Sequence, residues 1–363
     1  MKKLLPEVCT IQYGFPFDSA KFSDSNGMPL IRIRDVVRGY SETYTTEEYK
    51  SEYIVHENDL LIGMDGEFNI AKWGKTPALL NQRVCRLAPK DSIDKDYLFY
   101  FMPIALKRIE EKTPFVTVKH LSAKELNKIE IPVLSLEEQR KIAETLSKVD
   151  ELIAFREQQL AKLDELVKAR FVEMFGESEY PRNSLISLII EGAGLSYGIV
   201  QPGDDGTGDM GVLRPVDFAD GKIKTDSIKY IDRSLGDGFK KTELNGNELL
   251  ITVRGTTGIT ALTDSRFKGM NVTRGIAVIR YDKKKVDSIY LNEYIKMEKS
   301  QQYIKEHTRG ATLQQINLSE LRDLEIVIPP LPLQRVFATF VEHVDQQKQT
   351  VQQSLEKLEL LIK

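Results

Sequence analysis

The stretch Asn58-Asp-Leu-Leu-Ile62 decides how this chain is organised, because it returns 189 residues later as Asn247-Glu-Leu-Leu-Ile251. Further matches flank it on both sides: Arg32 and Asp35 match Arg214 and Asp217, and Gln139-Arg140 matches Gln334-Arg335. A period near 190 residues is too long for a solenoid repeat, so each copy should be a domain with its own connector. Two such modules suggest a protein that recognises two similar ligands at a fixed separation.

Composition limits the field without choosing a function. The chain has 363 residues, which is long enough for two or three domains. Of these residues, 41% are hydrophobic and 29% are charged, as in ordinary globular proteins. No run of eighteen apolar residues occurs, so no membrane span is expected. Cys9 and Cys85 fit a reducing compartment, and we expect the cytoplasm. These cysteines and the scattered histidines lack metal-ligand spacing, so no metal site is expected.

The charge distribution also restricts the mode of binding. The formal net charge is −3, the two globular halves carry nearly equal numbers of basic and acidic side chains, and the segment 134–179 is acidic. A polyanion such as DNA would therefore have to bind through local patches rather than a global positive field.

The clearest predicted element is a long helix over residues 136–175. This segment contains neither Pro nor Gly, and Gly176 follows it as a stop signal. Ser135 is a suitable N-cap, and Glu137 and Glu138 favour the first turn.

Apolar residues within this helix and within the end of the second copy alternate in steps of four and three, which is the heptad pattern of a coiled coil. The seam positions are Ile142, Leu146, Val149, Ile153, Leu160, Leu163 and Val167 in the first helix, and Phe337, Val341, Val344, Val351, Leu355, Leu358 and Ile362 in the second. Two matched seams in one chain should pack on each other, although each helix could instead pack only on its own domain. Leu152, Phe155, Leu166 and Phe171 widen the first seam and should contact a partner protein, a neighbouring domain or the chain's own core.

The globular parts are predicted to be mixed and rich in strands. Residues 30–34 alternate apolar and basic side chains, as in a half-buried strand. Residues 59–63 and 248–253 also read as strands, and helices are expected at 96–112 and 289–306. The copies differ most in loops within 190–245 and 256–270, which suits two modules that read different ligands.

Several motifs, repeated in one order, carry a family resemblance. They are Ile131-Pro-Val-Leu-Ser-Leu-Glu-Glu-Gln-Arg140, Ile328-Pro-Pro-Leu-Pro-Leu-Gln-Arg335, Leu61-Ile-Gly-Met-Asp-Gly-Glu-Phe-Asn-Ile70, Asn81-Gln-Arg-Val84 and the Leu-Ser pairs at 121–122 and 318–319. With a long heptad helix after each copy, the whole chain resembles the specificity subunit of type I restriction–modification systems. Each motif alone is only moderately specific, but their repeated order is highly specific.

The resemblance implies an α+β fold with two mixed α/β target-recognition domains and two long helices that form an antiparallel intramolecular coiled coil. The implied parts are target-recognition domain 1 at 1–133, the central helix at 134–178, target-recognition domain 2 at 179–330 and the distal helix at 331–363. Each domain would read one half of a bipartite double-stranded DNA site. The helices would set the spacing and dock two methyltransferase subunits, and restriction (motor-nuclease) subunits could join. S-adenosylmethionine and ATP with Mg²⁺ would then belong to those partners, with no cofactor in this chain and no membrane partner.

No catalytic residues are predicted within the chain itself. It contains no Asn/Asp-Pro-Pro-Tyr/Phe motif and no glycine-rich loop of the Rossmann or Walker pattern. We therefore expect a non-catalytic subunit. The main alternative is a coiled-coil scaffold for protein assembly that reads no DNA sequence, and a self-contained enzyme is a third possibility.

Candidate DNA contacts are the polar and basic residues on framework strands and loops, since Arg and Lys hold phosphate or guanine while Asn and Gln suit adenine. They are Arg32, Arg34, Lys72, Lys75, Asn81, Gln82, Arg83, Lys119 and His120 in the first copy, and Arg214, Arg254, Thr256, Thr257, Thr273, Arg274, Arg309, Thr312, Gln314 and Gln315 in the second. The apparent pairs Arg32/Arg214 and Arg83/Arg274 would be framework or phosphate residues, because base-reading residues should differ between copies. Trp73 is expected in a domain core.

Overall fold

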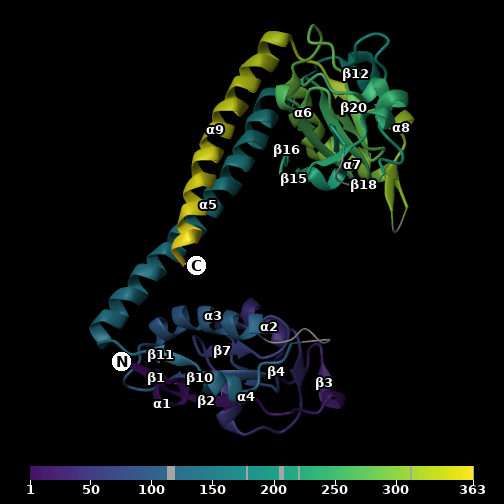
Figure 1. The fold of residues 1–363 in the computed structure, drawn as a ribbon. Helices are drawn as coiled ribbons and strands as arrows, with labels where there is room; N and C mark the ends of the chain where they lie inside the picture. The colour runs from purple at the N-terminus through teal and green to yellow at the C-terminus, as the bar shows by residue number, and fades with distance from the viewer. Residues whose placement is uncertain (113–118, 177–178, 204–207, 220, 311–312, 363) are drawn as a thin grey trace. The chain divides into compact units, whose positions relative to one another are not determined.

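The computed structural model describes residues 1–363 except 113–118, 177–178, 204–207, 220, 311–312 and 363 (Figure 1). The chain divides into two compact units, one of Met1–Glu157 with Ser354–Lys363 and one of Gln158–Gln353. Each unit holds one copy of the repeat. The division runs through both long helices, so the domain limits drawn from the sequence stay a prediction.

The first unit is built on an antiparallel sheet with the strand order β2-β10-β7-β8. A second sheet, β3-β5-β4-β9-β6, contains the parallel pair of β4 and β9. The elements are β1 (Lys2–Leu4), α1 (Leu5–Val8), β2 (Cys9–Tyr13), β3 (Phe22–Ser23), β4 (Met28–Ile31), α2 (Ile33–Arg38), β5 (Tyr44–Thr45), β6 (Ile54–Val55), β7 (Leu60–Gly63), β8 (Asn69–Lys72), β9 (Ala78–Leu80), β10 (Val84–Pro89), α3 (Lys95–Lys112), α4 (Ala123–Asn127) and β11 (Glu130–Pro132). Leu98, Met102 and Leu106 of α3 are fully buried in one core with Leu60 and Ile62 of β7.

The second unit repeats this plan with the sheet β13-β20-β18-β22-β21 and a parallel pair of β14 and β19. Its elements are β12 (Arg182–Ser184), β13 (Ser196–Tyr197), β14 (Met210–Leu213), β15 (Phe218–Ala219), β16 (Lys222–Ile223), β17 (Lys229–Ile231), β18 (Leu249–Leu262), β19 (Asn271–Val272), β20 (Ile276–Ile279), α6 (Ser288–Lys296), α7 (Glu298–Glu306), β21 (Thr308–Arg309), β22 (Gln314–Ile316), α8 (Leu318–Arg322) and β23 (Glu325–Val327). The helix expected over 289–306 is therefore two helices, because Met297 between them adopts an extended backbone.

The repeated motif at 58–62 and 247–251 combines a fastened turn with a buried strand. The Asp59 carboxylate accepts a hydrogen bond from the His56 backbone N at 3.0 Å, and Glu248 accepts one from the Asn245 backbone N at 2.7 Å. The three apolar residues that follow each carboxylate are fully buried in β7 or β18. The acidic residue thus fixes the turn, and the apolar run supplies the sheet core.

The strand expected over residues 30–34 is wrong beyond Ile31. Arg32 is instead the N-cap of α2, where its backbone N donates to the Asp35 carboxylate at 2.9 Å. A carboxylate three residues after the cap satisfies a backbone N–H at a helix start, which ends the strand. The second copy repeats this contact between the Arg214 backbone N and Asp217 at 2.7 Å. The matched Arg and Asp residues are therefore part of a turn in both copies.

The long helices are α5 (Leu136–Phe175), with the predicted bounds, and α9 (Leu331–Ile362). Ser135 caps α5 as expected, because its hydroxyl accepts from the Glu138 backbone N at 3.3 Å while the Glu138 carboxylate accepts from the Ser135 backbone N. Such a reciprocal pair is a capping box.

The two helices run antiparallel. In the second unit Phe171 packs on Phe337 with ring centroids 5.5 Å apart, and Asp164 pairs with Lys348. In the first unit Arg156 Nε donates to Ser354 Oγ at 3.2 Å. From the first of these contacts to the last, the residue number decreases on α5 and increases on α9. The helices therefore run in opposite directions, which confirms the predicted antiparallel coiled coil and, with the two mixed domains, the α+β fold class.

Burial along the seam is uneven. Leu163 and Val167 of α5 are buried, as are Phe337, Val341, Val344, Val351 and Leu355 of α9. Leu146, Val149, Ile153, Leu160, Leu358 and Ile362 are half-buried, while Ile142 is 37% exposed. Of the residues expected to widen the seam, Phe171 is buried, but Leu152, Phe155 and Leu166 are exposed.

A buried glutamine fastens the start of each long helix to its own domain. The Gln139 side chain is fully buried, and its Oε1 accepts a hydrogen bond from the Asp94 backbone N at 2.7 Å. Its Nε2 donates to the Ser92 and Leu134 carbonyls. Asp94 in turn accepts from backbone N–H groups at the start of α3. The first turn of α5 is thereby tied to the first turn of α3.

The second copy repeats this arrangement at the start of α9. Gln334 is fully buried, its Oε1 accepts from the Asp287 backbone N at 2.8 Å, and its Nε2 donates to the Pro329 carbonyl at 2.7 Å. Asp287 caps α6 as Asp94 caps α3. We call these two arrangements the helix anchors; they explain why the glutamine of Gln-Arg recurs in both copies.

An aromatic cluster joins α5, α6 and α9 within the second unit. Its members are Phe171, Phe175, Tyr290, Tyr294 and Phe337, with neighbouring ring centroids between 5.1 and 6.4 Å apart. Burial raises the pKa of the Tyr290 hydroxyl, which donates to the Val327 carbonyl at 2.7 Å. The cluster seals the C-terminal end of α5 into the core of this unit.

Candidate nucleic-acid interface

Backbone hydrogen bonds establish which loop residues correspond in the two copies. The Gln82 N donates to the Phe15 carbonyl and the Arg274 N donates to the Ile199 carbonyl, each at 2.9 Å and each after the strand that forms the parallel pair. Gln82 therefore corresponds to Arg274. The interpretation that matched Arg83 with Arg274 is wrong by one residue.

Arg83 corresponds to Gly275 instead. The Arg83 carbonyl accepts from the Met64 N at 2.9 Å, and the Gly275 carbonyl accepts from the Val253 N at 2.8 Å. Two antiparallel bridges add a further correspondence, since Asp65 faces His120 in the first copy and Arg254 faces Gln315 in the second.

Four equivalent positions thus come together from separate segments in each copy. We call Asp65, Gln82, Arg83 and His120 the first loop cluster, and Arg254, Arg274, Gly275 and Gln315 the second loop cluster. Three residues of the first cluster and three of the second were candidates from the sequence alone. Asp65 and Gly275 were missed because only residues that could hold phosphate or adenine and guanine edges were considered.

The charged side chains of the first loop cluster pair with one another. His120 Nδ1 contacts an Asp65 carboxylate oxygen, and Arg83 Nη1 lies 3.1 Å from the same ring nitrogen. Arg83 Nε lies 3.7 Å from the other Asp65 oxygen. The Asp65 carboxylate therefore offsets the Arg83 charge locally and leaves the cluster a mixture of donors and acceptors.

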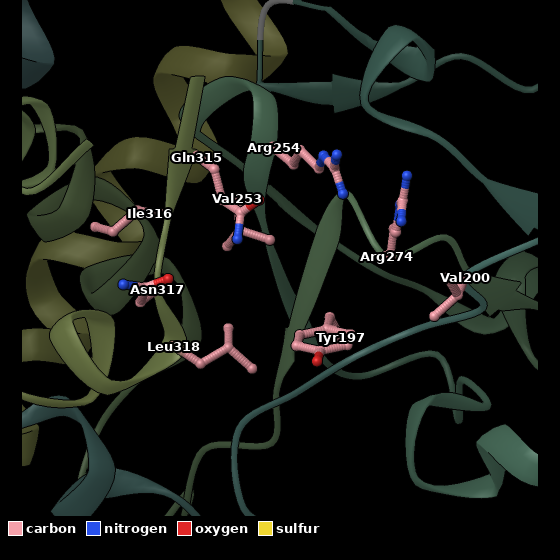
Figure 2. A pocket seen from close by; sticks show the side chains of 9 residues that line it. All are labelled: Tyr197, Val200, Val253, Arg254, Arg274, Gln315, Ile316, Asn317 and Leu318. Carbon is pink, nitrogen blue, oxygen red and sulfur yellow. The ribbon is translucent and has the colours of Figure 1, made fainter. Parts of the chain in front are cut away.

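The second loop cluster borders a cavity of about 340 Å³ (Figure 2). The cavity is lined by Tyr197, Val200, Val253, Arg254, Arg274, Gln315, Ile316, Asn317 and Leu318. Figure 2 shows the two arginines toward one end and Tyr197 with Leu318 toward the other. Arg274 is exposed and Arg254 half-buried. Among the residues that the structure describes, no carboxylate pairs with either guanidinium, so both remain available to a ligand.

Backbone geometry explains why the cation shifts by one residue between the copies. A Cβ atom on Gly275 would lie 2.6 Å from Cγ of Pro215, so this position excludes a side chain unless the proline moves. In the first copy this position holds Arg83, whose φ of 71° is uncommon for a residue other than glycine. The second copy carries its cation one position earlier, at Arg274.

Other candidates in the first copy are engaged in contacts of their own. Lys72 pairs with Asp96 at 2.8 Å, and Lys119 pairs with Glu110 at 3.4 Å. The Asn81 side chain is buried and accepts from the Gln82 backbone N. Arg34 lies 3.7 Å from the Asp35 carboxylate, and Arg32 and Lys75 are exposed. Trp73 is 2% exposed and belongs to the core, as expected.

The second copy shows a similar division. The Arg214 side chain donates to the Asp217 carboxylate and the Ser227 carbonyl, so it supports the turn at 214–217. Arg309 pairs with Glu320 at 2.7 Å, Thr257 bonds Thr308, and Thr273 is buried. Thr256 and Gln314 are exposed, and Thr312 lies outside the described residues. Whether any of these side chains contacts DNA stays a prediction.

Other chemistry has little support in the described part of the chain. Within it, no three His, Cys, Asp or Glu side chains gather as metal ligands would, and no helix is both long and apolar enough to cross a membrane. Burial raises the pKa of the Cys9 thiol and of the Cys85 thiol to about 12 each. Neither cysteine is therefore a thiolate near neutral pH, the form that a nucleophile needs.

Comparison with known proteins identifies the family. A model described as "Type I restriction modification DNA specificity domain" matches residues 1–165 and 207–360, which is most of the chain. The chain belongs to this family. Both matched segments of the specificity domain contain a loop cluster and a helix anchor, so the repeat found in the sequence corresponds to the two family segments.

Individual relatives agree with this family. The type I restriction enzyme EcoBI specificity subunit of Escherichia coli is 29% identical over 370 residues, covering 94% of this chain and 78% of that protein. The type I restriction enzyme MjaIX specificity subunit of Methanocaldococcus jannaschii is 27% identical over 305 residues, covering 74% of this chain and 66% of that protein.

Solved structures support the fold. A type I restriction–modification S subunit from M. genitalium superposes with a TM-score of 0.57 at 14% identity, and the match covers 100% of this chain and 93% of that chain. A chain from a structural study of complex assembly and conformational transition in a type I R-M system gives a TM-score of 0.63 at 17% identity, with 100% and 95% coverage.

Proposed function

We propose that this chain is the DNA-specificity subunit of a type I restriction–modification complex and that each recognition domain reads one half of a bipartite target. The observation that carries the proposal is the pair of loop clusters, which occupy equivalent positions on one framework but carry different polar groups. A protein that reads two different half-sites needs this combination, since the framework positions the reader and the side chains choose the base.

The long helices would hold the two readers at a set spacing and dock the other subunits. The antiparallel seam supports a rigid spacer, because each helix is fastened by an anchor to its own domain. Leu152 and Phe155 on α5 are 44% and 63% exposed and supply apolar surface for docking. We propose two methyltransferase subunits as the docked partners, with restriction subunits joining that complex.

The chain itself would perform no chemistry in such a complex. S-adenosylmethionine, ATP and Mg²⁺ would bind to the partner subunits, and this subunit would direct them to a DNA site. Because its target is the DNA of the cell, the complex would act in the cytoplasm. The finer composition follows from the family resemblance and is part of the proposal.

Adenine methylation of whole genomes tests this function. The full chain, co-expressed with its methyltransferase partners, should produce methylated adenine within one bipartite motif, and deleting the chain should abolish that motif. Replacement of one recognition domain by that of a family member with a different DNA target should change one half of the motif only. Unchanged methylation after replacement of both domains would refute DNA reading and favour the coiled-coil assembly scaffold.

A further inference from the structure

The two loop clusters differ most in charge at the same backbone positions. Where the first copy has Asp65, the second has Arg254, and these residues form equivalent antiparallel bridges. Where the first copy has Gln82, the second has Arg274. The first cluster therefore presents one carboxylate beside one guanidinium, whereas the second presents two guanidinium groups and no carboxylate.

We propose that Arg254, Arg274 and Gln315 read base edges in the second half-site and that a guanine is recognised there by one of the two guanidinium groups. This inference rests on the proposed function and makes it specific. At the position equivalent to Arg254 the first loop cluster presents Asp65 to the other half-site, so an acceptor of hydrogen bonds stands where the second copy has a donor.

The change in charge favours base contacts over phosphate contacts. The phosphate backbone carries the same charge in both half-sites, so a position that contacts phosphate in both copies requires a donor in both. A carboxylate at position 65 would repel phosphate at the point where Arg254 would attract it. A base edge can present an acceptor in one half-site and a donor in the other, which matches the observed exchange.

The geometry of the second cluster favours guanine. An arginine can donate two parallel hydrogen bonds to O6 and N7 of guanine, and a free guanidinium is required for this contact. Arg254 and Arg274 both lack a carboxylate partner among the described residues. Gln315, on the neighbouring strand β22, adds an amide of the kind that pairs with adenine. Val253 and Leu318 contribute apolar side chains to the lining of the same cavity.

The test compares variants of the full chain in the complex with its methyltransferase partners. Arg254→Gln and Arg274→Gln are assayed on duplexes that carry the wild-type motif, each base pair of which is varied in turn. Arg266→Gln is the matched control, because Arg266 is an exposed arginine of the same unit that pairs with Asp264. Arg274→Lys keeps the charge but removes the two-pronged donor. Thermal unfolding of each variant checks that it folds.

At least one glutamine variant should weaken binding to the wild-type duplex roughly tenfold or more and relax the requirement for one guanine in the second half-site only. If Arg274 is the guanine reader, Arg274→Lys should relax the same position. Arg266→Gln should leave the motif unchanged. The inference is overturned if the glutamine variants lose affinity equally for every duplex, Arg274→Lys restores the affinity lost in Arg274→Gln, and every base requirement stays intact. That result would indicate phosphate contacts. If the wild-type complex recognises no defined motif, the proposed function itself fails.

Discussion

The helix anchors and the loop clusters show opposite relations between the two copies of the repeat. At the anchors, Gln139 and Gln334 are both fully buried, and each accepts a hydrogen bond from the backbone N of an aspartate. That aspartate caps α3 in the first copy and α6 in the second. At the clusters, Asp65 is exchanged for Arg254 on an equivalent bridge. The two copies thus agree at residues that hold the geometry and differ at residues that we propose to read DNA.

The largest expected difference between the copies lies at equivalent positions of the long helices. Phe337 is fully buried in the aromatic cluster, whereas its counterpart Ile142 is 37% exposed. Phe337→Ala should destabilise the second unit by about 3–5 kcal/mol, as for a buried phenylalanine. Ile142→Ala should cost about 1 kcal/mol or less, because little apolar area is lost. Chemical denaturation of both variants measures the two values, and equal losses would contradict the asymmetry.

The next largest effect concerns the acidic residue of the repeated motif. Burial tends to raise the pKa of Glu248, but hydrogen bonds from the Asn245 and Asn247 backbone and from Thr263, together with Arg280, lower it overall. A lowered pKa means that this stabilisation is present above the unfolded value of about 4.3 and is lost as pH falls through the folded value.

Glu248→Gln should therefore cost about 2–3 kcal/mol at neutral pH, since charged hydrogen bonds are lost from a buried site. The difference between the variant and the wild type should shrink as the pH is lowered below about 4. Unfolding curves across pH measure this convergence. A gap that stays constant down to pH 2 would show that the carboxylate charge contributes nothing.

The anchors should respond equally in both copies. Gln139→Leu and Gln334→Leu keep the side-chain size but leave the Asp94 or Asp287 backbone N without its acceptor, at a cost of about 1–2 kcal/mol each. Hydrogen exchange at those two amides should accelerate in the respective variant. Loss of protection in only one copy would break the equivalence of the anchors.

The smallest effect is expected at two equivalent surface ion pairs. Lys2 lies 3.1 Å from Glu130, and Arg182 lies 3.4 Å from Glu325, with every side chain more than half exposed. Exposed pairs contribute between zero and about 1 kcal/mol. Glu130→Gln and Glu325→Gln should therefore shift the melting temperature by only a few degrees, and salt should reduce even that shift.

Sequence patterns predicted the parts of the fold that depend on local periodicity. The Ser135 cap, the stretch without Pro or Gly and the stop at Gly176 located α5 to the residue. The apolar runs after Asp59 and Glu248 located the start of the central strands, but β18 continues to Leu262, beyond the predicted end at residue 253 and into a stretch predicted as loop. The strand over 30–34 was wrong because a capping carboxylate, Asp35, overrode the alternation of apolar and basic residues. The helix over 289–306 was wrong because a single extended residue, Met297, carries no sequence signal strong enough to mark a break.

The candidate site was harder to predict because it depends on tertiary contacts. Asp65, Arg83 and His120 come from three segments, and only the folded chain shows that they pair. The match of Arg83 to Arg274 followed residue identity, whereas the hydrogen-bond register assigns Gln82 to Arg274. Identity between copies marked the framework correctly at the turns but could not resolve a shift of one residue in a loop.

The anchors have a consequence for how new specificities can arise. Among the described residues, the hydrogen bonds of the Gln139 and Gln334 side chains all go to backbone atoms. At the anchors, a domain therefore needs to present only the same turn of main chain, whatever side chains its loops carry. Recombination between related genes could therefore exchange a whole domain, and a new DNA target would arise in one genetic event without any change to the anchors.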